Sequence, residues 1–311
     1  MPQAAYKTQT QQVSAQFINS NFVRKLDDGR TKEAEAEGTA FIRQKLRQES
    51  YAREVIEPVM LGDDEIDRDE NTDQPKKIVE KEMDSVATFV PFMGTGPRTW
   101  FRGPRFAVYF GKTESQRFTK SKFELMTYQN DIRKILSDNS VKDMADQEDQ
   151  KFTDTVNAIL TLNPTQVLAP GTFSSSAFKL GFQNLINRRQ PLGKMLMTKS
   201  LYYEALDLPA TSVGNDVASR HYDLGIEAEE KLWGIPVIST IKKEIVDDAA
   251  GTVRRSVYIF APQNYLGCFF LLQDATLYIK QEADIIEFWS YAAPGIGIGN
   301  TKAVSRLDFL P

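Results

Sequence analysis

Residues 89–112 read FVPFMGTGPRTWFRGPRFAVYFGK. Residues 86–90 and 106–110 are rich in β-branched and aromatic side chains, which is typical of strands. Between them, Gly96-Pro97 and Gly103-Pro104 favour a wide turn. The pattern predicts a long β-hairpin with a projecting tip.

The tip of this hairpin combines aromatic and arginine side chains, a composition that is enriched at protein interfaces. The residues concerned are Arg98, Trp100, Phe101, Arg102 and Arg105. An isolated hairpin is only marginally stable, so a projecting one needs a partner surface. We therefore predict an inter-subunit contact at the tip. The alternative is a loop that folds back on its own domain.

Charge changes sign abruptly next to the hairpin. Residues 61–90 carry 4 basic and 10 acidic side chains, whereas residues 91–127 carry 7 basic and 2 acidic ones. Two interpretations remain open: an ordinary solvated surface, or complementary patches on neighbouring copies that steer assembly.

The first 30 residues are rich in Gln, Asn and Ser, which indicates an extended arm that orders against a neighbour. Its expected anchors are Phe17, Ile18 and Phe22. A polar helix is predicted over residues 32–56, where Ala, Glu, Gln, Lys and Arg dominate. Four of its basic residues are candidates for facing DNA on an inner surface: Arg43, Lys45, Arg47 and Arg53.

An acidic segment, residues 63–73, resembles a calcium-binding loop only superficially. Its Asp and Asn residues alternate, but Thr72 stands where the loop needs glycine and Ile78 where it needs a bidentate Glu. An acidic linker is the better interpretation.

The remainder of the chain has α+β character. A long helix is predicted over residues 131–160, with a break at Asp138-Asn139, and a second helix over 174–189. Further segments are predicted as a short helix, 201–206, and as strands, namely 195–197, 236–238, 256–260, 268–272, 276–279, 285–289 and 303–310. Strands in runs with few helices indicate an α+β fold.

Composition and motifs argue against an enzyme. The 311 residues include one cysteine, Cys268, and one histidine, His221, so cysteine-cluster and multi-histidine sites are excluded. Phosphate-loop, dinucleotide-binding and nucleophile-elbow motifs are missing. We therefore predict no catalytic, cofactor-binding or metal-binding residues and no cofactor. The net charge of −4 argues against a dedicated nucleic-acid binder. The longest apolar stretch is too short for a membrane span.

The order of these parts resembles the Hong Kong 97-type major capsid protein of tailed bacteriophages. The resemblance covers most of the chain and rests on the order of the predicted elements and on the composition of particular segments. Besides residues 89–112, it rests on NSVKDMADQEDQKFTDTVNAIL (139–160), KLWGIPVIST (231–240) and VYIFAPQNYLGCFFLLQDATLYIK (257–280).

The resemblance implies an α+β capsid fold with an arm, an extended loop, a peripheral domain with a long spine helix, and an axial domain. The expected boundaries are 1–70 for the arm and polar helix, 71–125 for the extended loop, 126–165 plus 270–311 for the peripheral domain, and 166–269 for the axial domain.

The function implied is self-assembly through hexamers and pentamers into an icosahedral virion shell around double-stranded DNA. Assembly would take place in the host cytoplasm without a membrane. The implied partners are further copies of the chain, a portal, decoration proteins in some members, and packaged DNA that is contacted non-specifically. A short arm favours a separate scaffolding protein or a mature form of the chain. Lys112 lies in the loop, where some members form crosslinks, but no crosslink is assigned to it.

Three alternatives remain open at this point. An encapsulin-like cargo shell shares the fold, and a tail or sheath subunit would form tubes or rings. An enzyme with an unrecognised site is the third.

Overall fold

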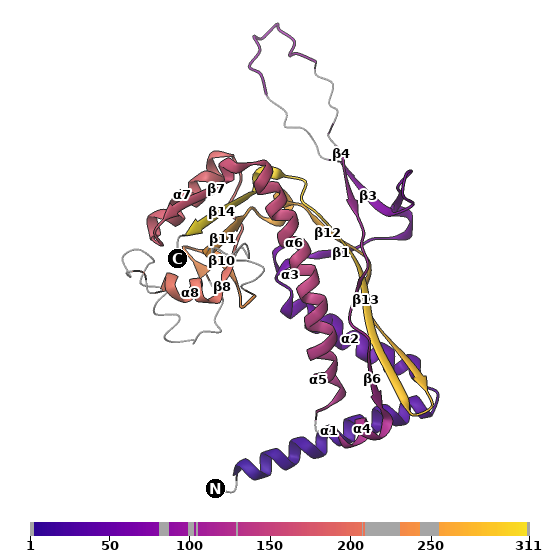
Figure 1. The fold of residues 1–311 in the computed structure, drawn as a ribbon. Helices are drawn as coiled ribbons and strands as arrows, with labels where there is room; N and C mark the ends of the chain where they lie inside the picture. Colours follow the sequence, from indigo (N-terminus) through magenta and orange to yellow (C-terminus); the bar gives the residue numbers. More distant parts are fainter. Residues whose placement is uncertain are drawn as a thin grey trace.

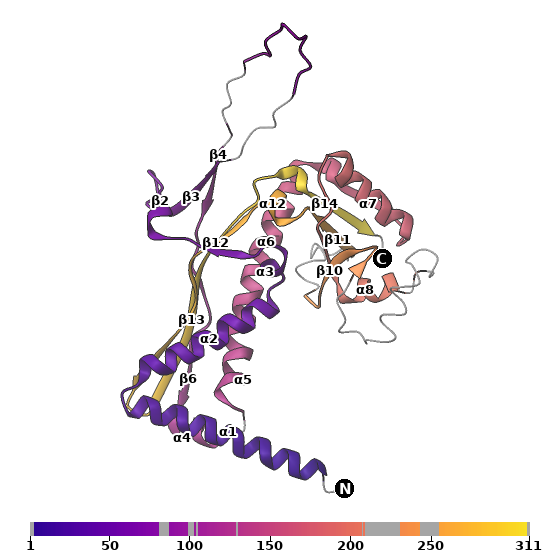
Figure 2. The same cartoon turned by 180° about the vertical axis from the view of Figure 1, so that it is seen from behind.

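The computed structural model describes residues 3–80, 87–98, 103, 105–128, 130–206, 208, 231–242 and 255–309, with side chains of the first helix from residue 15 onward. In this part of the chain, the strands form three sheets, which we call the long sheet, the broad sheet and the loop sheet. The long sheet extends away from the broad sheet, and the loop sheet leads to a projecting loop (Figures 1 and 2).

The long sheet is built on one antiparallel hairpin. Its strands are β1 (Pro58–Met60), β12 (Cys268–Glu282), β13 (Ile285–Gly297), β5 (Thr113–Glu114) and β6 (Phe118–Ser121). The sequence predicted separate strands at 268–272 and 276–279, but both belong to β12. An irregular register around Gln273 interrupts the pairing of β12 with β13 without ending the strand.

The two faces of this hairpin differ in chemistry. One face carries Leu277, Ile279 and Phe288, which are buried against helices. On the other face Tyr278 stacks between Trp289 and Tyr291, with ring centroids 5.8 and 5.1 Å apart. Lys112 and Arg117 lie over the outer rings of this row, at 4.8 Å from Tyr291 and 5.0 Å from Trp289. Among the described residues, helices cover only the opposite face of this hairpin, so these side-chain contacts stiffen the face without helices.

The broad sheet lies between two groups of helices. Its strand order is β7 (Val167–Gly171), β14 (Val304–Phe309), β11 (Arg255–Phe260), β8 (Lys194–Thr198), β10 (Ile235–Thr240) and β9 (Lys231–Leu232). One face packs on Phe152 and Val156 of the long helix, and the other packs on Phe178 of α7 (Ser175–Asn187) and on α8 (Lys199–Leu206). A further helix, α12 (Gln263–Leu266), connects β11 to β12.

The last strand separates from the hairpin that precedes it. β14 pairs with β11 and with β7, so it completes the broad sheet. The range 270–311, expected to be peripheral as a whole, is therefore divided between two sheets.

The long helix predicted over residues 131–160 is one rod with a local change of pitch. It consists of α5 (Ile132–Leu136), a π-helical segment (Ser137–Val141) and α6 (Lys142–Leu162). The expected break at Asp138-Asn139 falls within the π segment. Pro164, in a 3₁₀ turn (Pro164–Gln166), follows the helix end.

The prediction of an extended arm over the first 30 residues is wrong, because α1 (Gln3–Asp27) is a helix. Glutamine is a good helix former. Ile18, Phe22, Val23 and Leu26 recur at helical spacing and pack into the core beneath the long sheet. The tertiary contacts of these apolar side chains stabilise a helix in a segment whose composition is otherwise polar.

The predicted helix over residues 32–56 is divided at Ser50. The parts are α2 (Thr31–Glu49) and α3 (Tyr51–Val55), and the Ser50 side chain caps α3 by accepting a hydrogen bond from the backbone N–H of Arg53. Gly38 lets α2 approach the long sheet, because a Cβ there would lie 2.3 Å from Leu277.

The extended hairpin exists, but its first strand lies earlier than predicted. The loop sheet consists of β2 (Asp67–Arg68), β3 (Pro75–Glu80) and β4 (Arg105–Tyr109). β3 pairs with β4 from Lys76 opposite Tyr109 to Glu80 opposite Arg105. Residues 87–90, expected as a strand, are not strand. The polar, Lys-containing β3 was missed because the strand prediction followed apolar composition.

Candidate assembly surfaces

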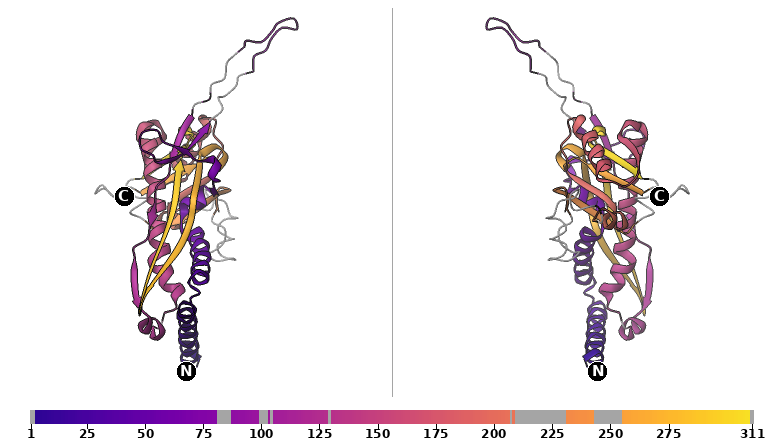
Figure 3. Two further views of the ribbon diagram at one scale, coloured as in Figure 1. Left: turned by 90° about the vertical axis from the view of Figure 1, so that its right-hand side faces the viewer. Right: turned by 90° about the vertical axis from the view of Figure 1, so that its left-hand side faces the viewer.

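The projecting loop exposes apolar side chains completely. Phe89, Phe92 and Met93 are 100, 111 and 100% exposed, and their segment lies far from the remainder of the molecule (Figure 3). The Gly94 N–H donates a 2.7 Å hydrogen bond to the Pro91 carbonyl and closes a turn. Phe92 and Met93 occupy the central positions of this turn, so their side chains point outward.

Such exposure indicates a surface that is covered in the functional state. Burying one large apolar side chain contributes about 1.5–3 kcal/mol. Exposed apolar patches on a soluble chain mark interaction sites. The sequence did not predict these residues as contact residues, because Phe89 was assigned to a strand and the contact was predicted at the Arg, Trp and Phe residues that follow Pro97.

The residues predicted at the tip have different outcomes. Arg98 is exposed on the projecting loop. Trp100, Phe101 and Arg102 lie outside the described residues. Arg105 is at the base of the loop in β4, where it forms a 2.6 Å ion pair with Glu80, so its placement at the tip is wrong.

The ion pair between Arg105 and Glu80 joins the basic segment 91–127 to the acidic segment 61–90 within one chain. Lys76 lies 2.8 Å from Asp69 and Lys77 lies 3.6 Å from Glu65, so these two pairs neutralise charge inside the acidic segment itself. Hydrogen bonds from Lys76 and Thr72 lower the pKa of Asp69. Part of the charge complementarity predicted between copies is thus used inside the loop sheet and its base.

The predicted arm anchors mostly contact their own chain. Phe22 stacks on Phe288 with centroids 5.9 Å apart, and Ile18 packs against the same core. Phe17 is 67% exposed and remains available to a partner. The prediction that all three anchor the arm on a neighbour is therefore wrong for Ile18 and Phe22.

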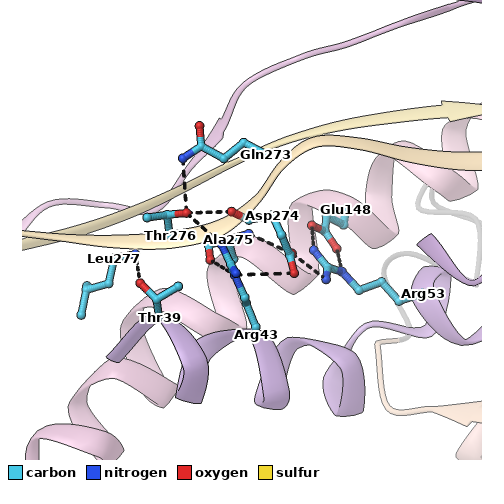
Figure 4. Close-up of polar contacts among 9 residues, drawn as sticks. All are labelled: Thr39, Arg43, Arg53, Glu148, Gln273, Asp274, Ala275, Thr276 and Leu277. Atoms are coloured by element: carbon cyan, nitrogen blue, oxygen red, sulfur yellow. Dashed lines mark hydrogen bonds and ion pairs between the residues drawn. The ribbon is translucent and has the colours of Figure 1, made fainter. Parts of the chain in front are cut away.

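Arg53 is buried, so the prediction that it faces DNA is wrong. Its guanidinium makes bonds of 2.7 and 2.8 Å to the Glu148 carboxylate and a third of 3.0 Å to Asp274 (Figure 4). Burial alone would lower the pKa of Arg53, but Glu148 and Asp274 raise it above its ordinary value. The cluster joins α3, α6 and β12 at one point.

The other basic candidates lie on α2 in different surroundings. Arg43 donates to the Ala275 carbonyl at 2.8 Å and to Thr276 at 3.3 Å, beside the irregular part of β12 (Figure 4). Its side chain remains 42% exposed. Lys45 is half-buried and Arg47 is exposed. A contact of Arg43, Lys45 and Arg47 with DNA stays a prediction.

A second buried cluster connects the broad sheet to α6. The Asp149 carboxylate accepts hydrogen bonds from Ser50, the Ala52 N–H and Lys242, at 2.9, 2.9 and 2.7 Å. Burial raises the pKa of Asp149 to about 6, although Lys242 and the hydrogen bonds act in the opposite direction. Burial also raises the pKa of Tyr51, which donates to the Asp149 carbonyl.

Replacing Asp149 with asparagine is expected to change how stability depends on pH. A pKa raised from 3.8 to about 6 means that the folded state binds the proton more tightly than the unfolded chain. The stabilisation that protonated Asp149 gives the folded state is fully present below pH 4 and is lost as pH rises through about 6. The wild type should therefore lose stability relative to D149N across that window.

The measurement is urea unfolding of both proteins from pH 4 to pH 7, because the difference between them removes the titration of other carboxylates. Asp154→Asn, on the same helix, is the matched control and should track the wild type. The raised pKa of Asp149 would be contradicted if the free energy of unfolding of the wild type, minus that of D149N, rises with pH.

Within the described ranges, no group of three or more His, Cys, Asp or Glu side chains is arranged to hold a metal ion. In the same part of the chain, every helix is too short or too polar to cross a membrane. His221 lies outside the described residues. Burial raises the pKa of the half-buried Cys268 thiol.

Comparison with known proteins places the fold. No family model matches the sequence, and no curated protein matches it. Among solved structures, the asymmetric unit of the bacteriophage PhiM1 mature capsid matches 84% of this chain and 88% of its own, with a TM-score of 0.56 and 10% identity. The capsid structure of cyanophage P-SCSP1u matches 82% of this chain and 86% of its own, with a TM-score of 0.52 and 10% identity.

A virus-like particle from Pyrococcus furiosus also matches, over 88% of this chain and 98% of its own, with a TM-score of 0.50 and 14% identity. The chain therefore has the α+β fold of Hong Kong 97-type phage capsid proteins, as predicted from its sequence. At these identities the comparison establishes the fold, and function has to be argued from the surfaces.

Proposed function

We propose that this chain is a major capsid protein whose copies assemble through hexamers and pentamers into an icosahedral shell around double-stranded DNA. The observation that carries the proposal is the projecting loop with exposed Phe89, Phe92 and Met93, on a fold shared with phage capsids. A loop that extends this far from its own core can bury those side chains only on another molecule.

The role is structural and not enzymatic. The two buried charged clusters described above have structural partners: Arg53 binds Glu148 and Asp274, and Asp149 binds Lys242. Buried charges of this kind hold elements together when every member is paired. We assign them to holding α3 and the broad sheet on the long helix.

The partners follow from the same proposal. Further copies of the chain cover the loop, and a scaffolding protein, a portal and decoration proteins complete the particle. DNA is contacted weakly and without sequence preference, because a chain of net charge −4 cannot coat a duplex by charge alone. Arg43, Lys45 and Arg47 remain the candidates for that contact. The protein would reside in the virion shell after assembly in the host cytoplasm.

The proposed division into parts follows the sheets. Within the range 1–70, α1 and α2 lie against the long sheet, β1 belongs to that sheet and β2 belongs to the loop sheet. The extended loop, 71–125, contains β3 and β4 of the loop sheet. Residues 126–165 with the hairpin of β12 and β13 form the peripheral domain. The broad sheet and its helices form the axial domain, to which β14 is added.

An encapsulin-like cargo shell is the second candidate, since the Pyrococcus furiosus virus-like particle shares the fold. The content of the particle distinguishes the two. A capsid protein is expected to yield closed shells by negative-stain microscopy and nuclease-protected DNA in particles from the native source. Shells holding protein cargo without DNA would favour the second candidate, and tubes or rings would favour a tail or sheath subunit. A compact monomer at high concentration, with a scaffolding protein supplied, would contradict assembly altogether.

A further inference from the structure

Three glycines at the end of β13 and directly after it lie against the base of the projecting loop. At this base, β3 and β4 stand between the long sheet and the loop (Figure 1). The glycines alternate along the chain and therefore share one face of the extended backbone. We call them the glycine seat: Gly295, Gly297 and Gly299.

The face of β4 that rests on the seat is apolar and consists of Phe106, Val108 and Phe110. Each of these side chains lies over one glycine. A Cβ atom added to Gly297 would lie 2.3 Å from Val108, and one added to Gly295 would lie 2.7 Å from Phe110. For Gly299 the distance to Phe106 would be 2.5 Å. Any larger residue on the seat would therefore have to displace either β4 or the seat itself.

The seat replaces a continuous strand ladder between the loop sheet and the long sheet. β4 pairs with β3, and it meets β13 through side chains that lie on bare backbone. Sheets that carry side chains on both inner faces stack about 10 Å apart, whereas glycine permits a closer approach. The Gly111 N–H donates to the Pro294 carbonyl at 3.1 Å, directly before β5 pairs with β13. Beyond this bond, packing over the seat determines the angle of the loop sheet.

The seat itself is held from the side of the broad sheet. Its part within β13 pairs with the start of β12. Directly after the seat, the Asn300 N–H donates to the Leu266 carbonyl at 3.2 Å. The Asn300 side chain donates to Gln190 and to the Tyr265 carbonyl, both at 2.8 Å. Because these bonds fix the seat, a methyl group added to it should move β4.

We propose that the glycine seat sets the direction in which the projecting loop leaves the subunit, and thereby determines whether Phe89 and Phe92 reach a neighbouring copy. The proposal rests on the proposed function, because it identifies the residues that aim the same loop. The three glycines are positioning residues that act through β4.

The direction of the loop sheet is measured on unassembled subunits by pulsed electron double resonance between two spin labels. The labels are attached at Glu80→Cys and Leu162→Cys in a Cys268→Ser background, since both native side chains are exposed, at 67 and 80%. Gly297→Ala is expected to shift the mean distance, because its Cβ displaces Val108. Val108→Ala removes the obstructing methyl group, so the double variant should recover the wild-type distance.

Gly181→Ala is the matched control. A Cβ at Gly181, in α7, would lie 2.8 Å from Ile259 and 3.0 Å from Leu307, so it creates a similar conflict beneath the broad sheet. Both alanine variants should lower the melting temperature, but Gly181→Ala should leave the label distance unchanged. An equal shift in both variants would show general loosening of the fold and would overturn the proposal.

Assembly is measured separately on unlabelled subunits. Gly297→Ala is expected to raise the critical concentration for shell formation at least about tenfold, because a misdirected loop leaves its apolar side chains unburied. Adding Val108→Ala should reverse this increase. A wild-type label distance in Gly297→Ala would overturn the role of the seat, even if the wild type forms shells. A shifted distance with unchanged shell formation would support the role of the seat in aiming the loop while contradicting the loop contact of the proposed function.

Discussion

Replacing Arg53 with alanine is expected to destabilise the folded subunit by roughly 3–5 kcal/mol, because it leaves the Glu148 carboxylate buried without its cation, and Asp274 keeps only the longer 3.7 Å ion pair with Arg43. The side chains of Arg53 and Glu148 are 1 and 0% exposed, and that of Asp274 is 9% exposed. The guanidinium also lies over the Phe269 ring at 6.0 Å. Urea unfolding of wild type and R53A, followed by circular dichroism, measures the difference.

Arg47→Ala provides the matched control, since Arg47 is exposed in the last turn of α2. A surface substitution of this kind is expected to change stability by less than about 0.5 kcal/mol. A triple variant that combines Arg53→Met, Glu148→Gln and Asp274→Asn should recover part of the loss, because no unpaired charge remains. If R53A unfolds at the same urea concentration as R47A, the cluster is not what holds α3 on α6 and β12.

Substituting the loop side chains is expected to abolish assembly while leaving the subunit folded. The variant carries Phe89→Ser and Phe92→Ser, both at fully exposed positions. Since neither ring packs on its own core, the free energy of unfolding should change by less than about 0.5 kcal/mol. Each ring, however, contributes about 1.5–3 kcal/mol when it is buried on a neighbour, and a shell repeats this contact in every copy.

Sedimentation velocity separates shells from free subunits, and thermal unfolding verifies the fold. Leu162→Ser controls for the loss of an exposed apolar side chain elsewhere. Arg98→Glu tests the charge at the same loop and should weaken assembly less than the double serine variant, because an exposed ion pair contributes at most about 1 kcal/mol. Shells at wild-type yield from the double serine variant would show that the loop is not an interface.

The sequence alone predicted those helices and strands whose apolar residues, spaced for that element, are also the ones buried in the folded protein. Phe152 and Val156 recur at helical spacing within the helix predicted over residues 131–160, and both are buried against the broad sheet. The run at residues 256–260 predicted a strand, and β11 is central to the same sheet. Gly and Pro residues before the strand-like segment Phe106–Phe110 indicated a hairpin, because Gly-Pro pairs between two strand-like segments are typical of turns.

Only the tertiary structure decided which partners these elements meet. Arg53 looked like its exposed neighbours on a polar helix, yet its carboxylate partners lie 95 and 221 residues away in the chain. The start of the extended hairpin depends on β3 pairing with β4 and not on the more apolar residues 86–90. The helix α1 is polar in composition but lies on a core made by α2, α4 (Lys122–Thr127) and α5. Local sequence specifies which side chains need burial or a counter-charge, whereas long-range packing determines which residue supplies it.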